Sequence, residues 1–135
     1  GLRRLGMAHV VKSAIETDEM LPAVAQGAIG IERRINDTNA ADMLAAIHDT
    51  QTGQRLAVER AFLAALDGSC ETPIAGLAEL DGSNMRFRGQ VLRPDGSESI
   101  GDDVSGTIED GVAMGEAMAA KLLTEAGEGF FEWRS

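Results

Sequence analysis

The sequence has 135 residues, of which 44% are hydrophobic and 25% are charged. This is enough for one soluble domain with a real core, or for a small domain plus part of another. The formal net charge of −10 and the aromatic content of 4% argue against binding to nucleic acid or to an anionic membrane, since both need basic patches. No apolar run is long enough to cross a bilayer. Because the chain opens without Met and enters a helical pattern at once, we expect an upstream part.

The first half of the chain is predicted to contain a helix, a strand and a second helix. Residues 3–15 have an apolar spacing that is closest to helical. Residues 23–32 combine apolar side chains with two glycines and show no helical period, which predicts a buried strand that another segment crosses closely. The Asn-Asp-Thr-Asn cluster at residues 36–39 predicts a turn and a helix start, with the helix reaching Ile47.

The second half is predicted to fold as a helix, three antiparallel strands and a final helix. The expected elements are a helix from about Thr52 to Leu66, strands at 74–80, 85–92 and 98–104, and a helix from about Ile108 to Ala126. The third strand is the most polar and is expected at an edge. The fold class is therefore α+β, with a three-stranded antiparallel sheet and helices on one face. Strand 23–32 lacks local partners, so we expect it and the helices near it to belong to upstream α/β domains.

Cys70 is the only cysteine and the first candidate for chemistry. Alone it can form neither an internal disulfide nor a thiolate metal site, and it fits a reducing cytosol. A helix end before it and Pro73 after it predict a loop, where a nucleophilic thiol would be held by rigid elements. The alternative is a small buried hydrophobic residue. The two histidines, His9 and His48, show no ligand spacing and indicate no metal site.

Three weaker candidates have ordinary alternatives. Gln26 and Gly27 could present backbone amides to an anion, or could lie in a close-packed strand. Arg4 could bind a carboxylate through its planar guanidinium group, or could lie on a solvated helix face. Glu59 and Arg60 could form a pair on a helix surface that adds little to helix stability. The residue pattern alone therefore indicates a soluble acidic α+β domain with a loop cysteine.

Three stretches together resemble the hydroxymethylbilane synthase (porphobilinogen deaminase) family. They are RLGM at 4–7, LPAVAQGAIGIE at 21–32, and ERAFL at 59–63 followed by LDGSCETPI at 66–74. The second is similar to the family's LPAVGQGALGIE and departs from it at Ala25, where glycine is usual, and at Ile29. The third is similar to ERAFL…LEGGCQVPIG, with Ser69 in place of the second glycine. The likeness extends over the whole chain and is weaker after residue 80.

This resemblance implies an enzyme that joins four porphobilinogen molecules head to tail into hydroxymethylbilane, releasing ammonia. The family's cofactor is a dipyrromethane, held through a thioether to a loop cysteine that matches Cys70. A soft sulfur nucleophile suits this role, because it captures the electrophilic methylene carbon left when ammonia departs and forms a stable bond. Arg4 matches an arginine that binds pyrrole carboxylates, and Gln26 matches a residue of the same cleft. The catalytic aspartate lies upstream, so the segment itself is expected to hold no catalytic residue and no metal.

The resemblance also implies a division of the chain. Residues 1–21 would be the tail of the second domain, residues 22–47 a strand and helix returning to the first, and residues 50–135 the C-terminal domain with the cofactor. The expected partners are porphobilinogen and the upstream domains, without nucleic acid or membrane, in a monomeric cytoplasmic enzyme. The isolated chain is expected to be inactive. An alternative is a stand-alone α+β domain that binds a small ligand or acts as a thiol-redox regulator.

Overall fold

The computed structural model describes residues 1–66, 73–127 and 130 of the chain. The helices are α1 (Thr38–Ala45), α2 (Thr50–Ala65) and α3 (Gly111–Ala126), and the strands are β1 (Ile74–Asp81), β2 (Asn84–Leu92) and β3 (Ser99–Thr107). Short 3-10 helices lie at Ala8–Val10 and Ile108–Asp110. Each strand and helix predicted after residue 50 is confirmed within a few residues, as is the α+β fold class.

The sheet is antiparallel with the order β1-β2-β3. Ile74 pairs with Val91 at one end of β1, and β2 continues the ladder to β3 through Phe87 and Val104. The turn between β1 and β2 places Gly82 at φ 61°, a left-handed conformation that glycine adopts without steric cost. The β3 strand lies at an edge, as its polar sequence predicts.

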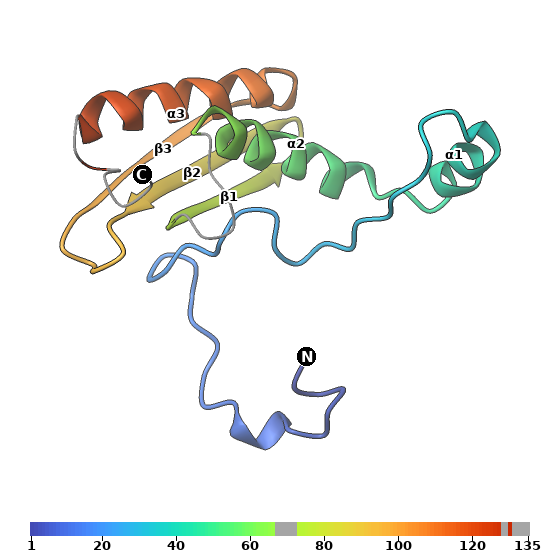
Figure 1. Ribbon diagram of the computed structural model, residues 1–135, viewed down its shortest axis with the longest axis horizontal. Coiled ribbons are helices and arrows are strands. Elements are labelled where there is room, and N and C mark those ends of the chain that lie inside the picture. Colours follow the sequence, from blue (N-terminus) through green and yellow to red (C-terminus); the bar gives the residue numbers. More distant parts are fainter. Residues whose placement is uncertain (67–72, 128–129, 131–135) are drawn as a thin grey trace.

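The core lies between one face of the sheet and helices α2 and α3 (Figure 1). Phe62 of α2 and Phe87 of β2 are fully buried, with ring centroids 5.0 Å apart and planes at 69°, a favourable edge-to-face arrangement. The two helices approach closely at Gly115, where an added Cβ would lie 2.6 Å from the backbone oxygen of Val58. The small residues of α3 therefore allow it to pack directly on α2.

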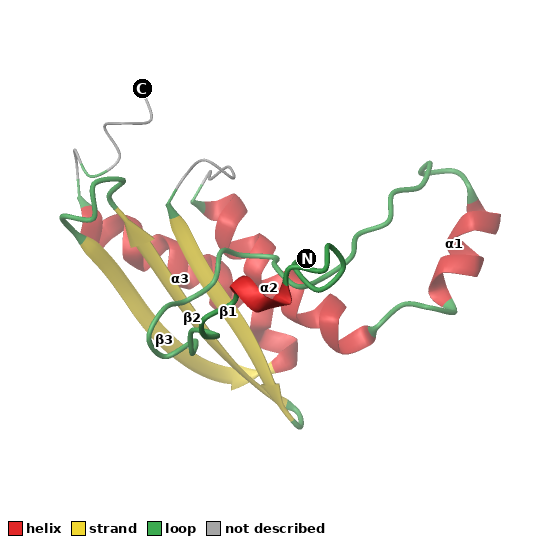
Figure 2. Cartoon of the chain, turned by 90° about the horizontal axis from the view of Figure 1, so that it is seen from below, coloured by secondary structure: helices red, strands yellow, loops and turns green. Residues whose placement is uncertain are grey.

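Residues 17–24 have no regular structure. They cross the other face of the sheet and then follow the edge of β1 (Figure 2). The N–H of Gly76 donates to the carbonyl of Pro22 at 2.9 Å, and Ala23 forms a single antiparallel bridge with Ala75. Val24 then enters the core beside Gly76. These contacts cover an edge of the sheet that would otherwise be open for pairing.

Two predictions for the first half of the chain are wrong. Residues 3–15 contain only the short turn of helix at Ala8–Val10, and residues 23–32 form one bridge instead of a strand. Positive φ angles of 61° at Ala25 and 77° at Gly27 turn the backbone away from β1, so the ladder cannot continue. The predicted helix after residue 36 is confirmed as α1, whose first turn is capped by the Asp37 carboxylate at 2.9 Å from the Ala40 N–H.

Helix α1 and the residues before it lie apart from the sheet (Figure 1). Large apolar side chains in this part are exposed, including Ile29 at 94%, Ile35 at 97% and Ile47 at 70%. None of the residues of α1 is buried. Apolar side chains contribute to the stability of the folded state only when another apolar surface covers them.

Candidate functional site

Cys70 lies in the sequence between α2 and β1, and residues 67–72, for which the sequence predicts a loop, lie outside the described residues. The described residues on both sides of this stretch are firmly held. Leu66 is 1% exposed and its N–H donates to the carbonyl of Phe62 at 3.1 Å, while the carbonyl of Pro73 accepts from the N–H of Leu92 at 2.9 Å. The six residues between them are therefore attached to a helix end and a strand start that belong to one packed core.

The end of the sheet beside this loop also holds Arg93 and Phe130. The Arg93 guanidinium carbon lies 4.9 Å from the centre of the Phe130 ring, within the range of a cation–π contact. Arg93 also pairs with Glu98 at 3.0 Å across the turn between β2 and β3. Because Phe130 is 1% exposed, this contact connects the chain after α3 to the sheet at the same end as Pro73.

The carboxylate of Glu59 connects two of the stretches that carry the family resemblance, the one at residues 21–32 and the one that begins at Glu59 itself. Its side chain points from α2 towards the edge of β1 and is only 6% exposed. It accepts hydrogen bonds from the backbone N–H of Ala25, at 3.0 Å, and of Ala78. One carboxylate thus satisfies an edge amide of β1 and an amide of the turn after Val24.

Burial of the Glu59 carboxylate raises its pKa, and the hydrogen bonds from Ala25 and Ala78 oppose that shift without cancelling it. The expected pairing with Arg60 on a helix surface is wrong, because Arg60 is exposed and Glu59 faces the core. The sequence spacing could have predicted the burial of Glu59, because Glu59 precedes the core residue Phe62 by three positions and residues three apart lie on one helix face.

Gln26 lies beside this carboxylate. It lines a small cavity of about 160 Å³ together with Arg55, Glu59 and Leu77. Its side chain is otherwise exposed, and the next residue, Gly27, is exposed as well. The proposed close-packed strand at this point is therefore wrong, and whether Gln26 lines a cleft stays a prediction.

Arg4 lies in the exposed N-terminal segment. The hydrogen bond that the structure gives it is a turn bond from its N–H to the carbonyl of Gly1 at 3.1 Å. Among the described residues, no contact joins Arg4 to Gln26. Cys70 lies outside the described residues. The grouping of these three residues around one cofactor stays a prediction.

Four basic residues, in β2, directly after β2 and in α3, are engaged with carboxylates. Arg86 binds Asp103, Arg88 binds Asp18 and Glu79, Arg93 binds Glu98, and Lys121 binds Asp102. These contacts neutralise the cations that a polycarboxylate ligand would need. Cations for such a ligand would have to come from outside this sheet.

Two negative findings limit the chemistry of the part of the chain that the structure describes. No group of three or more His, Cys, Asp or Glu residues there could hold a metal ion. No helix there is long and apolar enough to cross a membrane.

The fold defines a class: an α+β domain in which two helices cover one face of a three-stranded antiparallel sheet, with Cys70 in the stretch of sequence between α2 and β1. A family model described as "Porphobilinogen deaminase, C-terminal domain" matches residues 54–124, which is more than half of the chain. A second, described as "Porphobilinogen deaminase, dipyromethane cofactor binding domain", matches residues 1–42. The chain therefore belongs to the porphobilinogen deaminase family.

A curated relative supports this assignment. The porphobilinogen deaminase of Paracoccus denitrificans (strain Pd 1222) is 58% identical over 133 residues, which cover 98% of this chain and 42% of the relative. The chain thus spans less than half the length of that protein. The resemblance recognised from the sequence motifs is confirmed at the level of the family.

Proposed function

We propose that this chain is the C-terminal part of a hydroxymethylbilane synthase, the transferase that joins four porphobilinogen molecules with release of ammonia. The observation that carries the proposal is the match of both family models in order along the chain. It is supported by an identity of 58% to a porphobilinogen deaminase over 98% of this chain. We place the whole enzyme in the cytoplasm, as a monomer.

Cys70 is proposed to anchor the dipyrromethane through a thioether, and the residues around its loop fit this role. Leu66 and Pro73 fix the two ends of the loop in the core and the sheet. A group tethered to Cys70 would then be connected to the packed core on both sides of this stretch. When bound, the dipyrromethane supplies the primer to which pyrrole units are added.

The upstream domains are proposed to supply the cationic cleft. The basic residues of the sheet and of α3 already pair with carboxylates, and the net charge of the chain is −10. Arg4 and Gln26 are the residues of this chain proposed to contribute to that cleft. The chain alone is therefore expected to lack activity and to carry an unmodified Cys70.

The division of the chain follows the same proposal. Residues 1–21 would end the second domain, residues 22–47 would return to the first domain, and residues 50–135 would form the C-terminal domain. The exposed isoleucines at positions 29, 35 and 47 support this division, because upstream domains would cover them.

Activity of the full-length protein with Cys70→Ser tests the proposal, with Ser69→Gly as the matched control. The control restores the glycine that the family has at the neighbouring position and should leave product formation within about twofold of wild type. Cys70→Ser should abolish product formation and the colour reaction of the pyrrole cofactor with an aldehyde reagent. Normal turnover by the Cys70→Ser protein would contradict the role of this residue.

A further inference from the structure

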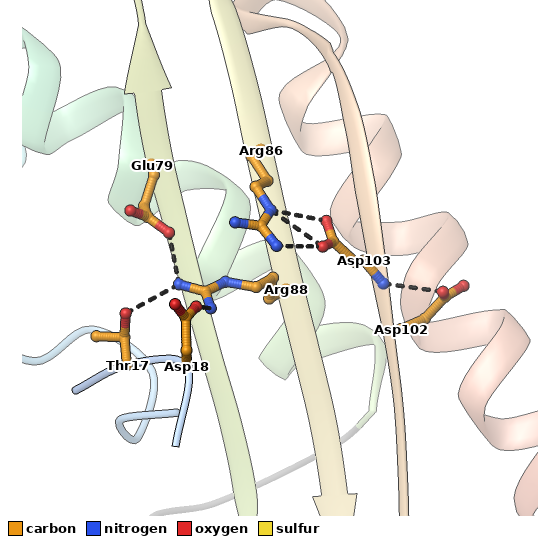
Figure 3. Close-up of polar contacts among 7 residues, drawn as sticks. All are labelled: Thr17, Asp18, Glu79, Arg86, Arg88, Asp102 and Asp103. Atoms are coloured by element: carbon orange, nitrogen blue, oxygen red, sulfur yellow. Dashed lines mark hydrogen bonds and ion pairs between the residues drawn. The ribbon is translucent and has the colours of Figure 1, made fainter. Parts of the chain in front are cut away.

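The chain that leads to Gln26 is held against the sheet. On the face turned away from α2 and α3, the guanidinium group of Arg88 donates to Thr17 at 3.1 Å and to Asp18 at 2.8 Å (Figure 3). A few residues later, the side chain of Val24 lies in the core. These contacts fix the path along which the backbone approaches Gln26.

Ala25, between Val24 and Gln26, turns the backbone. Its φ is 61°, a left-handed conformation that is strained for a residue with a Cβ atom and persists only where the surroundings hold it. The N–H of Ala25 donates to Oε1 of Glu59 at 3.0 Å. Hydrogen bonds to carboxylates are stronger than those to neutral acceptors, so the contact with Glu59 holds the turn from which Gln26 extends.

Glu59 is itself fixed by the fold around the sheet. It lies in α2, is only 6% exposed, and also accepts from the N–H of Ala78 in β1. Gln26 and Glu59 line the same small cavity. Since α2 is the helix that precedes Cys70 in the sequence, one carboxylate connects the turn before Gln26 to the helix before the proposed cofactor residue.

We propose that Glu59 is a positioning residue of the full-length enzyme, whose carboxylate holds the turn at Ala25 and thereby sets the place of Gln26. In this role Glu59 touches neither substrate nor cofactor and acts through Gln26. The inference rests on the proposed function, in which Gln26 contributes to the cleft, and adds a residue of α2 to that site. The role needs a hydrogen-bond acceptor at position 59, which glutamine supplies and leucine does not.

Hydrogen exchange measured by NMR on the 135-residue chain tests whether Glu59 holds the turn. At neutral pH, Glu59→Leu should raise the exchange rate of the Ala25 amide about tenfold, because this amide loses its acceptor. Glu59→Gln, whose side-chain oxygen can still accept from Ala25, should stay within about threefold of wild type, as should the exposed neighbour variant Arg60→Gln. The Leu92 amide, which donates to Pro73 at 2.9 Å, reports whether the sheet stays folded.

A double-mutant cycle in the full-length enzyme tests whether Glu59 acts through Gln26. Gln26→Ala and Glu59→Leu should each lower kcat/KM for porphobilinogen about tenfold, the usual effect of one lost polar contact. The double variant should also lose only about tenfold, because no Gln26 side chain is left for Glu59 to position. Glu59→Gln should keep kcat/KM within about threefold of wild type, and Arg60→Gln should leave it unchanged.

Glu59→Asp covers the case in which Glu59→Leu does not fold. It keeps the charge but withdraws the carboxylate by one methylene group, and it takes the place of Glu59→Leu in both measurements. Losses that multiply to about a hundredfold in the double variant, or an Ala25 amide that exchanges no faster than in wild type, would overturn the positioning role and leave the proposed function standing. A wild-type enzyme that forms no hydroxymethylbilane would overturn the proposed function, and this inference with it.

Discussion

The carboxylate of Glu59 binds two backbone segments that are far apart in the sequence, and its charge is costly in that place. Burial raises its pKa above the ordinary value, while the N–H groups of Ala25 and Ala78 favour the ionised form. A group with a raised pKa in the folded state favours folding most strongly below its unfolded pKa, and that contribution is lost as pH rises through the folded pKa.

Glu59→Gln should therefore change how stability depends on pH. Between pH 7 and about pH 4.5, the region where a raised glutamate pKa acts, wild type should gain free energy of unfolding relative to Glu59→Gln as the pH falls. Urea unfolding of both proteins across this range measures the difference. The neighbouring exposed variant Arg60→Gln should run parallel to wild type, and a parallel course for Glu59→Gln would contradict the assigned cause.

Ala25 has a φ of 61°, which strains a residue with a Cβ atom. Glycine, the usual residue in the family's motif, removes this strain at a small cost in unfolded-chain entropy. Ala25→Gly should raise the free energy of unfolding by about 0.5–1 kcal/mol. Ala23→Gly, two residues away at a position without positive φ, should not stabilise the chain in the same urea titration.

At the residue scale, the described structure agrees with the sequence on either side of Cys70: α2 ends at Ala65 and β1 starts at Ile74, directly after Pro73. The loop and the role predicted for Cys70 itself fall outside the described residues and stay predictions. The burial of Glu59 was missed because a charged residue is ordinarily placed on the solvent side of a helix. Its acceptance of edge amides from β1 depends on tertiary contacts that no local pattern encodes.

At the scale of elements, the close approach of α2 and α3 depends on Gly115. An added Cβ there would lie 2.6 Å from the Val58 carbonyl oxygen and 3.3 Å from the Phe62 nitrogen. Both are backbone atoms of α2, so the helices would have to separate.

Gly115→Ala should therefore lower the free energy of unfolding by about 2–3 kcal/mol, the usual cost of overpacking, despite alanine's better helix propensity. Glu116→Ala, at the next and exposed position of α3, should change it by less than about 0.5 kcal/mol. Thermal or urea unfolding of the two variants gives the comparison. A stabilised Gly115→Ala protein would show that the two helices can separate freely.

Elements after residue 50 could be predicted because the signals that define them lie close together in the sequence. Strands β1 and β2 are joined by a short turn at Gly82, and α3 ends at Gly127, whose φ is 69°. The elements before residue 36 could not be predicted in this way. Residues 23–32 have the composition of a buried strand, yet a strand forms only where a neighbour offers a full ladder. The edge of β1 offers one bridge, and the backbone then turns at Ala25.

For the whole molecule, the exposed apolar side chains around α1 offer a test of the proposed division into domains. Ile35 is 97% exposed, so Ile35→Ser should alter the stability of the 135-residue chain by less than about 0.5 kcal/mol. If upstream domains cover this surface, the same change should destabilise the full-length protein by about 2 kcal/mol. Unfolding measurements on both proteins test this difference, and equal small effects in both would contradict the proposed division into domains.

Cys70 is proposed to carry the pyrrole cofactor of the full-length enzyme. The most direct test is mass spectrometry of the native full-length protein after trypsin digestion, on the peptide from Ala61 to Arg86 that contains the cysteine. We expect a thioether-linked dipyrromethane on Cys70 in the full-length protein and a free thiol in the 135-residue chain produced alone. A free Cys70 thiol in a fully active enzyme, or the adduct on another residue, would contradict it.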